Sequence, residues 1–384
     1  MLFGIQLNGI LSAVLFVLLA PQSASNGTAA SSADRQREAA TAPVPGPSAT
    51  LSDREKAGLH GSVEECTVES TTPSRPGSSA WRMVNTTKYD PDGRIYQTGY
   101  INNDGSKGME SFTYSAEGHL LRTVWDTNGK TSDTIYNYDP QDRLIAVTSD
   151  AEWSTNFEYD EQGRKTRIVK SKLTASDNGD DRSRSGVDIE SENVDLFVFP
   201  PAGGTVKTLY NELDQIYESL VYGPNGDLLK RLTRAYDPKG RVVESSLFIE
   251  SLDSFLSPED RKRLSAEPGA FEKAQEEIAE FLGDQGLLAR STYVYDDHGR
   301  VIEKHVHVGP VQEITRITYN DQGDKAEEFE ATSDPARTPE QSEARFRYQY
   351  DNFNNWIERI VSSPSTANQS SRIWSTERRT IKYY

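Results

Sequence analysis

One short phrase recurs along most of the chain and restricts its fold more than any other feature. The phrase is Tyr-Asp, two variable residues, Gly, Arg and an aliphatic residue, and from Tyr89 to Tyr159 successive copies start 21 to 25 residues apart. Its Asp, Pro and Gly suit a type I turn followed by a glycine bulge, so each copy predicts the tip of an antiparallel hairpin. Clear copies start at Tyr89, Tyr114, Tyr138, Tyr159, Tyr236, Tyr295, Tyr319 and Tyr350, and weaker copies start at Tyr210 and Tyr222.

The segments between the tips alternate apolar and polar residues, as strands with one buried face do. A second turn lies half way between tips, at Asp104-Gly105 and Asn128-Gly129, so each repeat predicts two strands of about eight residues. In several copies a phenylalanine or a second tyrosine stands two positions before the tyrosine that starts the phrase. These pairs predict an aromatic stripe of Phe112, Tyr114, Tyr136, Tyr138, Phe157, Tyr159, Tyr293, Tyr295, Tyr348 and Tyr350.

The aromatic stripe has two interpretations. It is a core ladder that holds successive hairpins together, or it is a platform on which sugars or other flat ligands stack. These ten residues are therefore the candidate ligand-binding residues.

The amino-terminal part of the chain predicts export. Residues 1–25 combine an uncharged apolar run with small residues at Ser23 and Ser25, which is typical of a signal peptide, although an uncleaved anchor is the alternative. Residues 26–80 are rich in Ser, Ala and Pro and predict a disordered linker. Cys66, the only cysteine, excludes an intramolecular disulfide, and its acidic neighbours do not favour a reactive thiol.

Two insertions interrupt the repeats of the predicted β domain, residues 81–384. Residues 173–205 are acidic and rich in Ser and Gly, which predicts a loop, with calcium binding as an alternative that no hand-like spacing supports. Residues 250–289 predict a helical insertion, because Ser257 can cap a helix and Phe271, Ile278 and Phe281 share one helix face. We hypothesise that this apolar face packs on the aromatic stripe.

Composition and sequence motifs limit the partners, cofactors and catalytic sites that can be expected for this chain. The formal net charge of −17 argues against a nucleic-acid partner, and no membrane span is expected after the signal. No hydrolase, zinc-protease, phosphate-loop or dinucleotide motif occurs, so no catalytic residue, cofactor or metal is assigned. His305 and His307 with Glu303 could hold a metal, but exposed strand histidines are the more ordinary reading.

The Tyr-Asp-x-x-Gly-Arg phrase resembles the YD repeats of the Rhs family of bacterial secreted and surface proteins, and the β-shell of teneurins. The resemblance covers about residues 81–384, and long members of the family wind their strands into a cocoon that holds a carboxy-terminal toxin. Because the sequence stops at Tyr384 and contains no Gly- and Asn-rich self-cleavage motif, we expect a short form without the toxin domain. Its roughly 300 repeat residues predict a mainly β meander of antiparallel hairpins that forms a curved open sheet, with a small helical insertion.

The leading functional expectation is a non-enzymatic exported protein, secreted, periplasmic or at the cell surface. It binds a cell-envelope or extracellular ligand, with a glycan as the first choice of partner. Two alternatives remain: an enzyme that cleaves polysaccharides with surface carboxylates, and a protein-interaction component of an export system.

Overall fold

A computed structural model describes residues 51–74, 79–150, 153–172, 200–251, 286–335, 337–364 and 370–384, and the single residues 266, 269, 273, 276 and 282. The predicted signal peptide and nearly all of the acidic insertion lie outside the described residues. So does most of the helical insertion, of which Ala266, Lys273, Glu276 and Leu282 are described as helical. No helix among the described residues has the length and apolar character needed to cross a bilayer.

The described residues form twenty strands and one short helix, α2 (Asp53–Lys56). Ser52 caps α2 and makes a capping box with Glu55. The first ten strands are β1 (Val63–Thr72), β2 (Trp81–Tyr89), β3 (Ile95–Asn102), β4 (Lys107–Tyr114), β5 (Leu120–Thr127), β6 (Lys130–Tyr138), β7 (Leu144–Ser149), β8 (Trp153–Tyr159), β9 (Lys165–Lys172) and β10 (Thr205–Tyr210). The others are β11 (Ile216–Tyr222), β12 (Leu228–Tyr236), β13 (Val242–Ile249), β14 (Leu287–Tyr295), β15 (Val301–Val308), β16 (Val311–Tyr319), β17 (Lys325–Ser333), β18 (Glu340–Tyr350), β19 (Trp356–Ser362) and β20 (Ile373–Tyr383).

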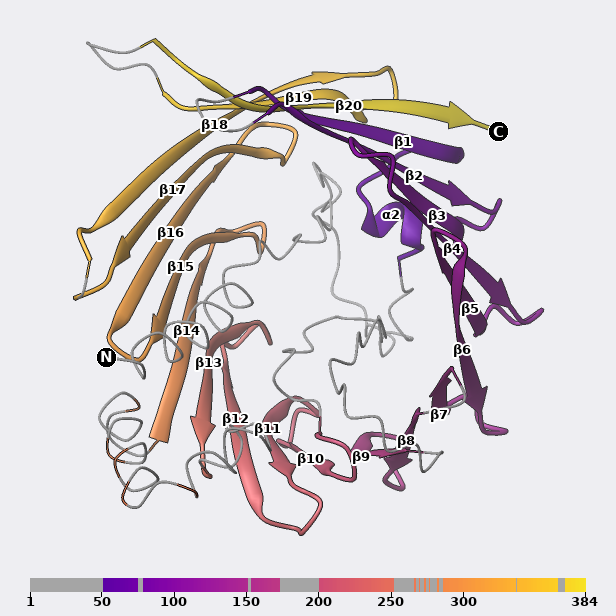
Figure 1. Ribbon diagram of the computed structural model, residues 1–384, viewed down its shortest axis with the longest axis vertical. Helices are drawn as coiled ribbons and strands as arrows, with labels where there is room; N and C mark the ends of the chain where they lie inside the picture. Colours follow the sequence, from indigo (N-terminus) through magenta and orange to yellow (C-terminus); the bar gives the residue numbers. More distant parts are fainter. Residues whose placement is uncertain are drawn as a thin grey trace, which may run out of the picture.

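The sheet is closed, so the prediction of a curved open sheet is wrong. Every strand pairs antiparallel with its neighbour in the chain, and the first strand, β1, also pairs with the last, β20, from Val63 and Tyr383 to Thr71 and Thr376. Figure 1 shows the resulting ring of strands. About 300 residues are enough to close the sheet because the strands are short. Twenty strands about 4.8 Å apart make a ring with a circumference of about 100 Å and a diameter of about 30 Å.

The closing strand β1 comes from the segment that was expected to be a linker. Its outer face carries Glu65, Thr67 and Glu69, so its composition is polar although it forms a regular strand. Sequence reasoning placed the start of the β domain at residue 81, and the sheet begins at Val63.

The seam between β1 and β20 is fastened by the chain that precedes β1. The fully buried Asn355 accepts a hydrogen bond from the backbone N–H of His60 (2.7 Å) and donates to the His60 carbonyl (2.9 Å). Its amide also donates to the Tyr383 hydroxyl (2.8 Å), and that hydroxyl donates to the Asp351 carboxylate. One asparagine therefore joins the β18–β19 tip, β20 and the chain leading into β1.

The recurring phrase forms hairpin tips, as predicted. At each tip the register shifts at the residue before the tyrosine, for example between Thr113 and Tyr114, as a bulge requires. The left-handed position is occupied at all ten tips, by Gly93, Gly118, Asp142, Gly163, Asp214, Gly226, Gly240, Gly299, Gly323 and Asn354. The two weak copies at Tyr210 and Tyr222 are therefore true tips.

The position of α2 identifies the inner face of the sheet. This helix lies inside the ring beside β2 and β3 (Figure 1), where Asp53 accepts a hydrogen bond from the Ile95 backbone (2.9 Å). Leu59, which follows α2, is buried with Cys66 and Tyr89. Side chains alternate between the two faces along a strand, and paired residues on neighbouring strands share a face. The faces of Cys66 and Tyr89 can therefore be followed from strand to strand, and they define the inner wall all round the ring.

The inner wall has an aliphatic part and an aromatic part. Strands β10 to β15 contribute aliphatic residues to a buried cluster that includes Val206, Leu232 and Val306. Leu282 of the helical insertion joins this cluster. Strands β3 to β8 instead present Tyr100, Trp125 and the first six residues of the aromatic stripe.

Candidate functional site

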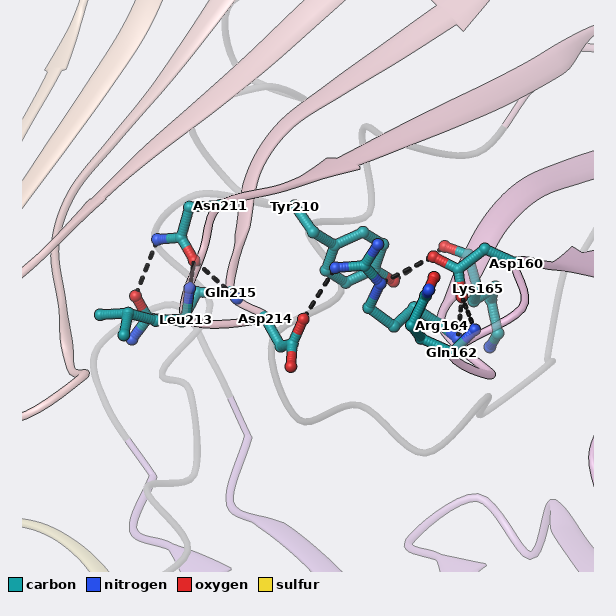
Figure 2. A network of polar contacts seen from close by, with 9 residues as sticks. All are labelled: Asp160, Gln162, Arg164, Lys165, Tyr210, Asn211, Leu213, Asp214 and Gln215. Atoms are coloured by element: carbon teal, nitrogen blue, oxygen red, sulfur yellow. Dashed lines mark hydrogen bonds and ion pairs between the residues drawn. The ribbon is translucent and has the colours of Figure 1, made fainter.

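Six of the ten tips are held by an aspartate carboxylate that accepts several hydrogen bonds, as at Asp160 (Figure 2). One carboxylate oxygen accepts from the backbone N–H groups of Gln162 (3.0 Å) and Arg164 (2.8 Å), and the other accepts from the Arg164 guanidinium (2.7 Å). Arg164 also reaches the next tip and pairs with Asp214 (2.7 Å). The Asp and Arg of the phrase are therefore committed to turn structure.

The Arg and Tyr of successive tips join neighbouring hairpins. The Arg164 guanidinium lies 5.0 Å from the centre of the Tyr210 ring, and the Tyr210 hydroxyl donates to the backbone carbonyl of Lys165 (2.8 Å). The same hydroxyl-to-carbonyl bond recurs at Tyr114, Tyr138, Tyr159, Tyr236, Tyr295 and Tyr319. We call this repeated Asp–Arg–Tyr arrangement the tip ladder.

The electrostatics of the tip ladder favour charged aspartate and neutral tyrosine. Backbone hydrogen bonding from Arg241, assisted by its guanidinium, holds the pKa of Asp237 below its ordinary value despite partial burial. Burial raises the pKa of Tyr295. These shifts have structural causes, and they do not by themselves indicate catalysis.

All ten residues of the aromatic stripe lie on the inner wall. Those on β4, β6 and β8 are near one another, whereas the pairs on β14 and β18 lie across the ring from them (Figure 1). Tyr136 and Phe157 are only 7% and 5% exposed and leave little surface for a ligand. Tyr348 and Tyr350 stack at 5.9 Å, and burial raises the pKa of Tyr348 to about 12. The role of these ten residues in ligand binding stays a prediction.

A second aromatic group, which sequence reasoning missed, lies on β3 to β5. The rings of Tyr100 and Trp125 are 6.0 Å apart and tilted by 31°, and both remain partly exposed. Gly108 on β4 makes room for them, because a Cβ there would lie 2.5 Å from Tyr100 Cε1 and 3.1 Å from Trp125 Cζ2. A glycine inside a strand pattern is the signal that could have found this site. We call Tyr100 and Trp125 the aromatic platform.

Two arginines gather on the inner wall beside the seam. The Arg379 guanidinium lies 3.5 Å from the centre of the Trp356 ring, and that of Arg359 lies 5.1 Å from it. Arg359 pairs with Glu377 (2.5 Å). Burial, and then the charge of Arg359, lower the pKa of Arg379, while Cys66 acts in the opposite direction.

The other candidate residues have ordinary partners. His305 and Glu303 are joined at 2.6 Å on the outer face, and Glu303 also accepts from Arg316 (2.8 Å). Among the residues that the structure describes, no group of three or more His, Cys, Asp or Glu side chains is placed to hold a metal ion. Cys66 is buried, which raises the pKa of its thiol.

Comparison with known proteins gives one family match. Residues 80–179 match the Teneurin YD-shell family. No curated protein matches the sequence.

Among solved structures, the chain is similar to a porin-like protein from Bacteroides uniformis, at 8% identity and a TM-score of 0.33, over 83% of this chain and 98% of that one. It is also similar to a chain in the TcdB2-TccC3-Cdc42 structure, at 15% identity and a TM-score of 0.28, over 79% of this chain and 16% of that one. A chain of the Photorhabdus luminescens Tc holotoxin pore is 11% identical with a TM-score of 0.23, over 79% and 18% respectively. The chain therefore spans less than a fifth of these two toxin chains.

Proposed function

We propose, from the premise that the chain is a YD-repeat protein, that it is an exported structural shell whose inner wall binds a cell-envelope or extracellular carbohydrate. The family match and the closed sheet support the structural part of this proposal. The apolar run and small residues of the amino-terminal segment support export.

The observation that carries the carbohydrate proposal is the aromatic platform. Sugar rings have an apolar face that stacks on aromatic rings, and polar groups at the edge of the stack orient the hydroxyls. Tyr100 and Trp125 offer such a surface, and Glu110 lies directly across from Trp125 on the neighbouring strand. The stripe residues Phe112 and Tyr114 continue the aromatic surface on β4.

Glycan binding by the full chain tests this proposal. The protein is applied to an array of envelope and extracellular polysaccharides, and affinity for any glycan that it retains is measured by calorimetry. We expect Trp125→Ala to weaken binding at least tenfold, and Phe329→Ala, which changes an outer-face aromatic, to leave it unchanged.

Each outcome of this experiment counts for or against the proposal. Retention of no glycan by the folded chain overturns the proposal, and so does an equal loss for both variants. Co-purification of a protein partner in place of a glycan would favour a role in an export system.

A polysaccharide-cleaving enzyme is the second candidate, and Glu313 is the observation that favours it. This residue is 8% exposed on the inner wall, and burial, followed by the charge of Glu330, raises the pKa of its carboxyl. A carboxyl whose pKa is raised in this way is suited to general acid catalysis of glycoside cleavage. Release of reducing ends that Glu313→Gln abolishes would support the enzyme, and a folded wild-type chain that releases none would exclude it for the glycans used.

A further inference from the structure

The aromatic platform and Arg379 lie on one row that crosses the seam. Arg379 of β20 is paired with Val68 of β1, Val68 with Asn85 of β2, Asn85 with Tyr100 of β3, and Tyr100 with Gly108 of β4. All five residues belong to the inner wall. Three strand steps separate Arg379 from Tyr100, which is about 14 Å at about 4.8 Å a step. We call this set the seam row.

Within the described ranges of the chain, the half-buried Arg379 has no carboxylate partner. Among the described residues it makes no ion pair within 4.0 Å, and its Nε and Nη1 atoms are buried without a hydrogen-bond acceptor. Stacking on Trp356 stabilises the cation, but it does not supply an acceptor. A buried N–H group without an acceptor is destabilising, so an incoming anion has more to contribute here than at a paired arginine.

The carboxylates near Arg379 are already engaged with other groups. Glu377 pairs with Arg359, whose own Nε is also buried without an acceptor. Asp324 accepts a hydrogen bond from the Tyr350 hydroxyl (2.7 Å). Within the part of the chain that the structure describes, the cluster therefore keeps one arginine without an ion pair, at one end of a row whose other end is aromatic.

We propose that the seam row binds an acidic saccharide, with a carboxylate of the chain at Arg379 and a sugar ring on the Tyr100–Trp125 platform. The saccharide lies across the strands from β20 to β4. Asn85, half way along the row, offers an amide that can donate to and accept from sugar hydroxyls. This inference rests on the proposed carbohydrate function and adds the class of glycan and the residue that selects it.

Calorimetry with three oligosaccharide series tests the inference on the full chain. One series consists of uronic acid oligomers, the second of neutral oligomers of the same length, and the third of sulfated neutral oligomers. We expect the uronic acid series to bind at least tenfold more tightly than the neutral series, with an affinity that falls as salt rises.

Arg379→Gln should remove this preference and bring both series to a similar affinity. Arg378→Gln is the matched control, because Arg378 is the preceding residue on the outer face, where it pairs with Glu358 (2.9 Å). Should Arg379→Gln fail to fold, Asn85→Ala supplies a second test and should weaken binding of the uronic acid series about threefold.

The outcomes separate this inference from the function on which it rests. Equal affinity for neutral and acidic oligomers, or an Arg379→Gln variant that keeps the preference, overturns the inference and leaves carbohydrate binding intact. Tighter binding of the sulfated series overturns the choice of a carboxylate. Failure of every series to bind overturns the inference, and failure of the polysaccharide array as well overturns the proposed function.

Discussion

Asn355 should make a large contribution to the stability of the closed sheet, although the copy of the phrase in which it lies departs from the usual sequence. In five other tips this position is arginine, bound to the aspartate of the same tip. Here the asparagine instead bonds both backbone groups of His60 and the Tyr383 hydroxyl. Asn355→Ala removes all three hydrogen bonds, and Asn355→Arg restores the residue typical of the repeat while removing the same contacts.

The expected cost follows from burial and from the number of bonds lost. Leaving one buried partner without its hydrogen bond costs about 1–3 kcal/mol, and Asn355 is 0% exposed. His60 is only partly buried, so water can replace part of what its backbone loses. We therefore expect Asn355→Ala to lower the free energy of unfolding by about 2–4 kcal/mol, and Asn355→Arg to lower it as well, since the longer side chain has no space.

Two measurements check this expectation. Urea unfolding followed by tryptophan fluorescence gives the loss of stability, and trypsin cleavage after Arg54 or Lys56 reports release of the segment before β1. Gln349→Ala is the control, because this amide is exposed and makes one hydrogen bond, to Glu358 (3.0 Å). Unchanged stability and proteolysis in Asn355→Ala, or a gain in stability in Asn355→Arg, would refute the reasoning.

Three further predictions concern the tips, the aromatic platform and pH. Arg300→Lys removes the guanidinium that bonds Asp296 (2.7 Å) and lies 4.3 Å from the centre of the Tyr319 ring, so urea unfolding should show a loss of about 1–2 kcal/mol; no loss would contradict the tip ladder. Gly108→Ala places a Cβ 2.5 Å from Tyr100 Cε1, so it should cost about 1–3 kcal/mol and alter tryptophan fluorescence, and an unchanged spectrum and stability would count against the platform geometry. The pKa of Asp237 and that of Asp296 lie below their ordinary value of 3.8, so their stabilisation is complete above that value and is lost as pH falls through the lower folded pKa. The free energy of unfolding should therefore fall below about pH 4, and Asp296→Asn should reduce this dependence.

The sequence predicted the local structure well because the tip chemistry is local. Asp160, Gly163 and Arg164 lie within five residues, and their hydrogen bonds fix the turn without help from distant parts of the chain. The Asn128-Gly129 turn is equally local, and both of its residues have positive φ. Alternation along the strands then determined which side chains share a face.

Closure could not be predicted because it depends on contacts between residues about 300 positions apart. The polar sequence of β1 resembled a linker, since its outer face is charged and its inner face is partly covered by Leu59. Twist and strand number decide whether the two ends of a sheet meet, and neither is encoded in a single repeat. The bonds that fasten the seam come from Asn355, where the sequence departs from the repeat.

The candidate site was found only in part, for a related reason. Recurring residues such as Tyr114 and Tyr159 drew the prediction, yet their hydroxyls serve the tip ladder. Gly108, Trp125 and Arg379 are not part of the recurring phrase, so the repeat does not reveal them. The pairing of their strands places them on one wall.

This contrast suggests how a repeat shell acquires a specific function. The Asp–Arg bond recurs at five tips and the tyrosine hydroxyl-to-carbonyl bond at seven, so these residues give the ring its regularity and do not single out one place on the inner wall. A ligand that binds one place on that wall must be recognised by residues that do not recur. The seam row meets this requirement, because it combines Arg379, Asn85 and the space above Gly108 in a single row. Substitutions at the tips should therefore change stability, whereas substitutions of Arg379 and Asn85 in the seam row should change binding.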